Sequence, residues 1–484
     1  MIPAEEIEKQ KQMIRRIRES AAARPAPPLA YIDTYGCQQN ESDSEKLRGM
    51  LAEMGYSFTG DEFAADVIVI NTCAIRENAE NRVFGNVGAL IHTKKAKPSQ
   101  IIAFCGCMAA VPEDADKIRQ SYRHVDLVFS PNILWRFPEL LYRTMTVSGR
   151  VFESEAGDGA VAEGLPVQRD GSIKAWLPIM YGCDNFCSYC IVPYVRGRER
   201  SRLPEVVVGE ARALVADGYK DITLLGQNVN SYGRGLDERV DFAALIRRIS
   251  EIDGDFLIRF MTSHPKDASE ELFRAMSESE KAARHIHLPF QAGNDRVLKL
   301  MNRGYTQDEY LEKVAAARRY MPDIVITSDV IVGFPGETGE EFEDTLRLIE
   351  KARFDAMFTF IYSKRPGTPA ASLPDTATRE EKQIRFDRLI GLQNAISEEK
   401  HAQYIGKTCR VLVDGESQDE RYRLKARTNG GRLVHLKGGR ELVGCFTDAM
   451  ITHCNSWSLF GELKAESYDN NRKIHKGEHE WLQE

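Results

Sequence analysis

Three cysteines lie close together in the segment YGCDNFCSYC, at Cys183, Cys187 and Cys190. Thiolates are ligands of zinc and of iron–sulfur clusters, so this C-x3-C-x2-C spacing predicts a metal site. A structural zinc ion needs four ligands, and this loop supplies only three. Three thiolates can instead hold a [4Fe-4S] cluster in which one iron has no protein ligand and is open to a small molecule. The alternative is a zinc loop completed by a distant cysteine or histidine.

A second set of cysteines is spread along the first part of the chain, at Cys37, Cys73 and Cys107. Each follows or ends an apolar run that is typical of a buried strand: LAYIDTYG, DVIVIN and QIIAFCG. The carboxyl ends of parallel strands meet along one edge of an open α/β sheet, where ligands usually bind. We therefore expect these thiols to meet in space and to hold a second cluster with an open iron. The alternative is that they are ordinary buried core cysteines.

The remaining cysteines are expected to belong to the core. Strand alternation places Cys105 on the same side as Cys107, so periodicity does not decide between them as ligands. Cys105 lies inside the apolar run, which favours a core position. Cys409, Cys445 and Cys454 fall on predicted strands near the end of the chain, and we interpret them as core residues too.

The elements that must position Cys37, Cys73 and Cys107 lie in residues 29–143. This region alternates strand and helix patterns, with a fourth strand expected at residues 126–130 and a helix over SDSEKLRGMLAEMGY. It predicts a small open α/β sheet with helices on its faces. Residues 1–28 form a charged helical stretch that is either a flexible extension or a docking helix. Residues 144–174 are rich in glycine and acidic residues and predict a linker.

The cysteine loop at 183–190 belongs to a second alternating region, residues 175–400. Six strand-like runs alternate there with helical patterns, too few for a closed eight-stranded barrel, so we expect an open partial (β/α)6 barrel. The loop follows the first strand, at the carboxyl end where barrel active sites lie. Residues 401–466 alternate apolar and polar residues between glycine turns and predict a small antiparallel β-barrel. Residues 467–484 are polar and predict a tail.

Composition limits the protein class. At about 100–200 residues per domain, 484 residues predict about three domains. Ten cysteines in a large chain without a secretory N-terminus favour metal binding or catalysis over disulfides. No apolar run is long enough to cross a membrane, so a cytoplasmic protein is expected. The net charge of -7 requires that any contact with nucleic acid be made by a local basic patch.

Longer segments resemble a known family. YGCDNFCSYCIVPYVRGRERSR is similar to the cluster loop of radical S-adenosylmethionine (SAM) enzymes. NTCAIRENAENRVFGNVGAL, LLGQNVNSYG, FMTSHPKD and HLPFQAGNDRVLKLMNRGYT resemble the methylthiotransferase branch, in detail the members that act on N6-isopentenyladenosine in tRNA. The resemblance covers roughly residues 29–465 and selects Cys107, in GCMA, over Cys105 as a ligand. The last part of this range, within 401–466, resembles the TRAM domain.

The resemblance implies a reaction. SAM would chelate the open iron of the first cluster, and its reductive cleavage would give a radical that takes hydrogen from C2 of the adenine at position 37 in the anticodon loop. The second cluster would hold the sulfur that is transferred, and no side chain would act as acid or base. Alternatives within the family are threonylcarbamoyladenosine in tRNA and a ribosomal-protein aspartate. An alternative of another class is a non-catalytic zinc protein that binds RNA.

Further candidates lie at the ends of the predicted barrel strands and in basic segments. The candidates for binding SAM are Gln227, Asn228, Ser263, Gln291 and Asp329. The candidates for binding RNA are Arg196, Arg198, Arg200 and Arg202 after the cluster loop, and Arg423 and Arg427 in the TRAM-like segment. The alternatives are polar groups already paired at strand ends, and solvated charged surfaces. The expected partners are tRNA and an electron donor such as flavodoxin or ferredoxin, with the chain acting as a monomer.

Overall fold

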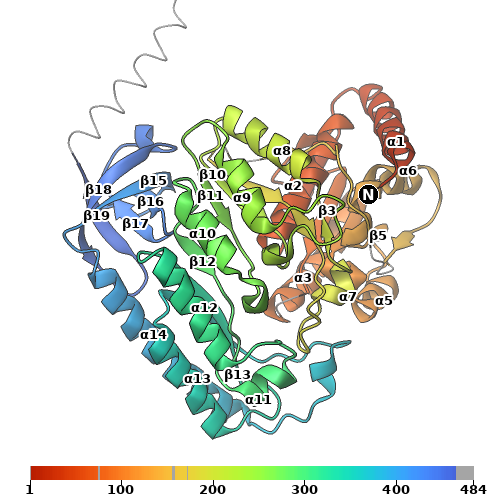
Figure 1. Cartoon of the computed structure of the whole chain (residues 1–484). Helices are drawn as coiled ribbons and strands as arrows, with labels where there is room; N and C mark the ends of the chain where they lie inside the picture. The colour runs from red at the N-terminus through yellow and green to blue at the C-terminus, as the bar shows by residue number, and fades with distance from the viewer. Residues whose placement is uncertain (1, 75–76, 155–158, 170, 172, 465–484) are drawn as a thin grey trace, which may run out of the picture.

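The computed structural model in Figure 1 describes residues 2–74, 77–154, 159–169, 171 and 173–464. A central β/α unit lies between an N-terminal α/β sheet and a C-terminal β-barrel (Figure 1). The predicted tail at 467–484 lies outside the described residues. Within the described part, none of the helices combines the length and the apolar composition that a membrane crossing demands.

The N-terminal sheet has six parallel strands in the order β2-β1-β3-β4-β5-β6. Its strands are β1 (Leu29–Thr34), β2 (Ser57–Phe58), β3 (Val67–Thr72), β4 (Ile101–Gly106), β5 (Leu127–Phe129) and β6 (Val151–Glu153). Its helices are α2 (Gln38–Glu53), α3 (Glu77–Ala89), α4 (Ile91–Ala96), α5 (Pro112–Ser121) and α6 (Phe137–Thr146), with 3-10 turns η1 (Cys107–Ala110) and η2 (Pro131–Arg136). Every residue of β3 is buried because helices cover both faces of the sheet.

The N-terminal segment is a docked helix. Helix α1 (Ala4–Ala22) buries Ile14 and Ile17 in the same apolar cluster as Leu47 and Met50 of α2. Of the two alternatives left open by the sequence, the structure therefore selects the docking helix over the flexible extension.

The region predicted as a linker is partly structured. It contains strand β6, which pairs in parallel with β5. Farther along, the backbone N–H of Gln168 donates to the carbonyl of Glu45 at 3.0 Å. A Cβ atom on Gly49 of α2 would lie 2.5 Å from the backbone of Pro166, so this segment packs tightly on the helix. The described part of 144–174 is thus fixed against the N-terminal sheet.

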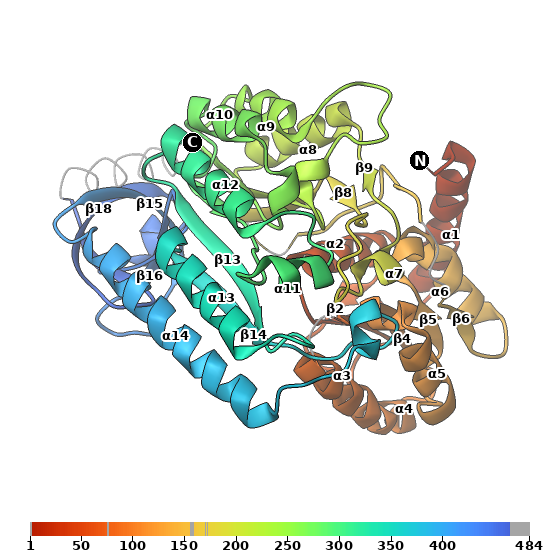
Figure 2. The same cartoon turned by 60° about the horizontal axis from the view of Figure 1, so that its bottom comes forward.

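The central unit is the predicted open barrel. Its strands are β7 (Lys174–Pro178), β10 (Asp221–Leu225), β11 (Leu257–Phe260), β12 (His285–His287), β13 (Val325–Val332) and β14 (Ala356–Ile361). They form two parallel three-stranded sheets, β11-β10-β7 and β12-β13-β14. Its outer helices are α8 (Pro204–Ala216), α9 (Phe242–Ser250), α10 (Glu270–Glu278), α12 (Gln307–Tyr320), α13 (Gly339–Ala352) and α14 (Arg379–Ala402). Figure 2 shows α13 and α14 side by side along one flank of the barrel.

The C-terminal unit is a closed barrel of five strands in the order β15-β16-β17-β19-β18. The strands are β15 (Thr408–Glu416), β16 (Leu424–Thr428), β17 (Leu433–Leu436), β18 (Phe446–Cys454) and β19 (Leu459–Leu463). The prediction of a wholly antiparallel barrel needs one correction, because β17 and β19 pair in parallel.

The closed barrel is attached to the central unit by polar contacts. The guanidinium of Arg259, on β11, donates to the carbonyls of Asn429 and Thr428 at 2.8 and 3.2 Å. A buried ion pair joins Arg432 to Asp355, just before β14. These contacts hold the closed barrel against the β/α unit (Figures 1 and 2).

Candidate cluster and cofactor sites

The loop that carries Cys183, Cys187 and Cys190 connects β8 (Met180–Tyr181) to α7 (Val192–Arg196), after the carboxyl end of β7. Hydrogen bonds fix its backbone. The N–H of Gly182 donates to Oε1 of Gln227 at 2.5 Å, and the N–H of Cys190 donates to the carbonyl of Cys187 at 2.9 Å. The position predicted for this loop, at the carboxyl end of the first barrel strand, is the position found.

The thiols of this loop lie in a buried environment beside one cation. Burial, reinforced by Cys187, raises the pKa of the Cys190 thiol to about 12, and burial also raises that of Cys183 to about 11. Such thiols lose their protons when they bind a metal ion, because the thiolate is the ligand. Arg303 donates to the Cys187 sulfur at 3.4 Å and to the carbonyl of Pro289 at 2.7 Å. A set of three soft donors with one guanidinium fits an iron–sulfur cluster.

The segments that carry the second set of cysteines lie at one edge of the N-terminal sheet. Cys37 lies at the start of α2, Cys73 follows β3, and Cys107 opens η1 directly after β4. A Cβ atom on Gly36 would lie 2.3 Å from Cβ of Cys73, so the first two loops are in contact. Burial raises the pKa of Cys107, and the guanidinium of Arg196 opposes that rise. The three segments that the strand-end argument selected thus lie near one another, and their role as ligands stays a prediction.

The backbone places Cys105 and Cys107 on opposite faces of the N-terminal sheet. Gly106 has a φ of +88°, and a Cβ atom added to it would lie 2.4 Å from the carbonyl oxygen of Thr72. The absence of a side chain therefore permits this close approach. The strand ends there, so Cys105 belongs to the apolar cluster on one face and Cys107 to the cluster on the other. The expectation that alternation places both on the same side was wrong because Gly106 interrupts the strand.

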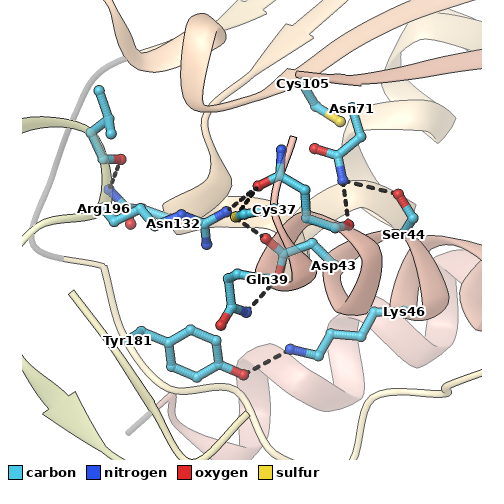
Figure 3. A network of polar contacts seen from close by, with 12 residues as sticks. Cys37, Gln39, Asp43, Ser44, Lys46, Asn71, Cys105, Asn132, Tyr181 and Arg196 are labelled. Atoms are coloured by element: carbon cyan, nitrogen blue, oxygen red, sulfur yellow. Dashed lines mark hydrogen bonds and ion pairs between the residues drawn. The ribbon is translucent and has the colours of Figure 1, made fainter. Parts of the chain in front are cut away.

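A polar network connects the three loops of the N-terminal site, and Figure 3 shows its centre. The side-chain amide of Asn40 donates to the carbonyls of Tyr35 and Thr72 at 2.8 and 2.7 Å. Its oxygen accepts from the Cys37 thiol at 3.6 Å and from Arg196 at 2.8 Å. One buried amide thus holds the chain before Cys37 and the chain before Cys73 in register.

The arginines after the cluster loop differ in exposure. Arg196 is only 5% exposed, and Arg202, at 7%, is paired with Glu163 at 2.7 Å and Glu210 at 2.9 Å. The prediction that these two contact RNA is contradicted by their burial. Arg198 is exposed and bonded to Asp184 at 2.8 Å, and Arg200 donates to the carbonyls of Arg196 and Arg198.

The SAM-binding candidates lie near the carboxyl ends of the barrel strands. Asn228 accepts from the N–H of His264 at 3.1 Å and donates to Asp267 at 2.8 Å, so it shapes the loops. The hydroxyl of Ser263 is buried and has no hydrogen-bond partner among the described residues, which leaves it available to a ligand.

Two further candidates are linked to each other. Gln291 adopts a left-handed backbone with φ of +71°, and its N–H donates to the carbonyl of Asp329 at 2.9 Å. The Asp329 carboxylate lies 3.3 Å from Nε2 of His287.

Sequence reasoning did not assign a role to Arg303, although it lies in a segment that carries the family resemblance.

The sequence matches three protein families along its length. They are the Radical SAM superfamily over residues 177–349, the Uncharacterized protein family UPF0004 over 29–130, and the TRAM domain over 402–464. The tRNA-2-methylthio-N(6)-dimethylallyladenosine synthase of Acetivibrio thermocellus is 47% identical over 466 residues, covering 96% of this chain and 97% of that protein. The enzyme of the same name from Thermoanaerobacter sp. is 47% identical over 462 residues, with 96% and 98% covered. The chain belongs to the family of the tRNA-2-methylthio-N(6)-dimethylallyladenosine synthases.

Solved structures agree on the fold. The radical S-adenosylmethionine methyltransferase TsrM from Kitasatospora setae, with tryptophan and a SAM analog bound, aligns with a TM-score of 0.54 at 15% identity, covering 71% of this chain and 74% of that one. The family membership and this alignment confirm the predicted fold class, an α/β protein whose partial barrel is followed by a TRAM domain.

Proposed function

We propose that this chain is a radical SAM methylthiotransferase that adds a methylthio group to C2 of N6-isopentenyladenosine at position 37 of tRNA. The observation that carries the proposal is the 47% identity, over nearly the whole chain, to synthases named for this nucleoside. The shared name favours isopentenyladenosine over threonylcarbamoyladenosine and over a ribosomal-protein aspartate.

The family implies SAM and a [4Fe-4S] cluster, and Cys183, Cys187 and Cys190 are the residues that would hold the cluster. When bound, it supplies the electron that cleaves SAM to a carbon-centred radical. The chain's own residues would bind the cluster and SAM and hold them in position. Arg303 places a positive charge at the Cys187 sulfur, and Ser263 offers a hydroxyl that has no hydrogen-bond partner in the described part of the chain. Burial of the loop keeps water from the reactive species.

We infer a second cluster at Cys37, Cys73 and Cys107. The proposal is supported by Cys107, which lies near Cys37 and the guanidinium of Arg196, and by Cys73, which packs on the loop before Cys37. A cation there suits a negatively charged group of the same type as at the first site. Such a group gives the transferred sulfur a place to bind. No acid or base is required of the surrounding side chains, which agrees with the buried, amide-rich network around Asn40.

The tRNA must present an adenine that is normally stacked. Turning it out of the anticodon loop costs a few kcal/mol, which contacts to phosphates can offset. Arg423 on the closed barrel and Arg198 after the cluster loop are exposed and are the remaining candidates for such contacts. Arg427 is half-buried and bonded to Asp414 at 3.0 Å. Flavodoxin or ferredoxin as electron donor, a monomeric state and a cytoplasmic location complete the proposal.

The test is mass spectrometry of tRNA nucleosides from cells that lack the gene and carry it again on a plasmid. The wild-type gene should restore 2-methylthio-N6-isopentenyladenosine. The gene with Cys187→Ala should leave N6-isopentenyladenosine unmodified at equal protein levels. A methylthio group on threonylcarbamoyladenosine instead, or no change in any nucleoside, would contradict the proposal.

A further inference from the structure

Arg196 connects the two cysteine sites. It is the last residue of α7, the helix that begins at Val192, directly after the loop ending at Cys190. Its guanidinium, however, lies in the N-terminal site, where it donates to Asn40 at 2.8 Å and to Asp43 at 2.9 Å (Figure 3). A residue that follows one set of thiols in sequence thus lies beside the other set in space.

The guanidinium is a permanent charge close to the thiols. Although burial opposes it, interactions with Cys107, Asp43 and Cys37, each of which is negative when ionised, raise the pKa of Arg196 above its ordinary value. The Asn40 oxygen that accepts from Arg196 also accepts from the Cys37 thiol at 3.6 Å. Because side chains so deeply buried are poorly screened by solvent, this charge acts strongly on its surroundings.

The position of Arg196 is fixed from several directions. The side-chain amide of Asn132 donates to the carbonyl of Val195 at 3.2 Å, which holds the end of α7 on the N-terminal unit. Lys46 of α2 donates to the hydroxyl of Tyr181, on β8, at 2.7 Å and makes a second link between the same two units. These contacts hold the backbone that carries Arg196 against the N-terminal unit, and the bonds to Asn40 and Asp43 hold its guanidinium there.

We propose that Arg196 is a positioning residue whose fixed positive charge sets the reduction potential of the group held by Cys37, Cys73 and Cys107. This inference rests on the second cluster proposed above. Reduction adds one negative charge to such a group, so a neighbouring cation favours reduction and a neighbouring anion opposes it. Arg196 and its partner Asp43 should therefore shift the potential in opposite directions.

The experiment uses the full chain with Cys183, Cys187 and Cys190 all changed to Ala, so that only the N-terminal site can bind iron. The protein is loaded anaerobically with iron and sulfide, and its midpoint potential is measured by redox titration followed by electron paramagnetic resonance. Arg196→Gln should make reduction at least tenfold less favourable, which is about 59 mV for one electron. Arg196→Lys should restore most of that shift, and Asp43→Asn should move the potential the other way.

Arg202→Gln is the matched control. Arg202 is about as buried as Arg196, lies in the same segment and is paired with two carboxylates. Among the described residues its polar contacts include no thiol. Equal potentials for Arg196→Gln and Arg202→Gln, or shifts of the same sign for Arg196→Gln and Asp43→Asn, would overturn the proposal. If Arg196→Gln does not fold, the test rests on Asp43→Asn. An unchanged or lower reduction potential in Asp43→Asn would then contradict the proposal.

The two proposals fail in different ways. If the background variant with intact Arg196 binds no iron, the second cluster is wrong and this inference falls with it. If it binds iron normally and the reduction potential is the same in Arg196→Gln and Asp43→Asn as in the background variant, only the proposed role of Arg196 is wrong.

Discussion

Each cysteine site places one buried arginine among its thiols. Arg303 contacts the sulfur of Cys187, and Arg196 lies beside Cys37 and Cys107. A negative charge that is removed from water needs a compensating partner, and a guanidinium provides one that stays charged at every working pH. The same solution occurs on two different frameworks, a barrel loop and a sheet edge. The pairing is a property of the residues and not of either fold.

The two sets of thiols should be separable by single substitutions. Cys187→Ala should remove roughly half of about eight irons per chain and abolish cleavage of SAM to 5′-deoxyadenosine, because one of the three thiols at the first site is lost. Cys73→Ala should remove the other half and stop methylthiolation while SAM cleavage continues. Iron analysis and chromatography of the products check both. Unchanged iron in Cys73→Ala would refute the strand-end ligand set, and undiminished cleavage in Cys187→Ala would refute the first.

At the scale of residues, spacing indicates which cysteines are candidate ligands but not which arginines are buried. A C-x3-C-x2-C loop carries its chemistry in the sequence itself, whereas a charged run does not record which of its members turn inward. Arg196 and Arg202 look like the exposed Arg198 in sequence and differ from it only through partners in distant segments, Asp43 and Glu163. Long-range pairing of this kind has no local signal.

At the scale of elements, the turn before Cys37 depends on a glycine. Gly36 has a φ of +115°, and a side chain there would meet Cβ of Cys73 at 2.3 Å. Gly36→Ala should therefore lower the free energy of unfolding by at least ~2 kcal/mol and reduce iron at the N-terminal site. Gly85→Ala is the control, because no described atom outside its own stretch of helix lies within 4 Å of the added Cβ, and α3 should gain up to ~1 kcal/mol. Urea unfolding and iron analysis compare the two, and equal effects would refute the steric argument.

Strand β12 should make the barrel sensitive to acid. Burial, followed by Arg259, lowers the pKa of His285 to about 3, while its ring accepts or donates at Thr327 across a 2.9 Å contact. Below a pH of about 6.5 the unfolded chain binds a proton that the folded chain refuses, so stability falls as the pH drops towards 3. By pH 5 this amounts to at most about 2 kcal/mol.

His285→Gln should reduce the loss of stability between pH 7 and pH 5, whatever its cost at pH 7. The measurement is the thermal unfolding midpoint at both pH values. The exposed His92 on α4, changed to Gln, serves as the control and should keep the wild-type difference. If the two variants lose stability equally on acidification, His285 is not the group responsible.

Elements within an apolar run were predictable, and an element without one was not. Strands β1, β3 and β4 are six residues each and match their predicted runs. Strands β5 and β6 have three residues each, but only β5 lies in a recognisable apolar run, whereas β6 is followed by acidic and glycine residues that predict a linker. The docking of α1 depends on Ile14 and Ile17 meeting α2, which helical periodicity alone does not reveal.

At the scale of the whole molecule, a net charge of -7 must still allow a polyanion to bind. Many basic side chains are already engaged inside the protein, including Arg432 with Asp355 and Arg427 with Asp414. Arg423, on the surface of the closed barrel, is exposed, and its side chain has no partner among the described residues. The acidic surplus therefore makes exposed cations on the closed barrel, such as Arg423, more important for tRNA binding, and it predicts a strong dependence on salt.

Arg423→Ala should weaken tRNA binding and lower the slope of log affinity against log salt by about 1, the effect of losing one phosphate contact. Binding of SAM and its cleavage without tRNA should not change, because the closed barrel lies away from the cluster loop (Figure 1). Arg319→Ala, on the outer helix α12 where the side chain is paired with Glu270 at 2.9 Å, is the control for a general loss of positive charge. Affinity measured at several salt concentrations separates the two. Identical slopes for Arg423→Ala and the wild type would remove Arg423 from the tRNA surface, and identical losses for both variants would mean that total charge, not its place on the barrel, governs binding.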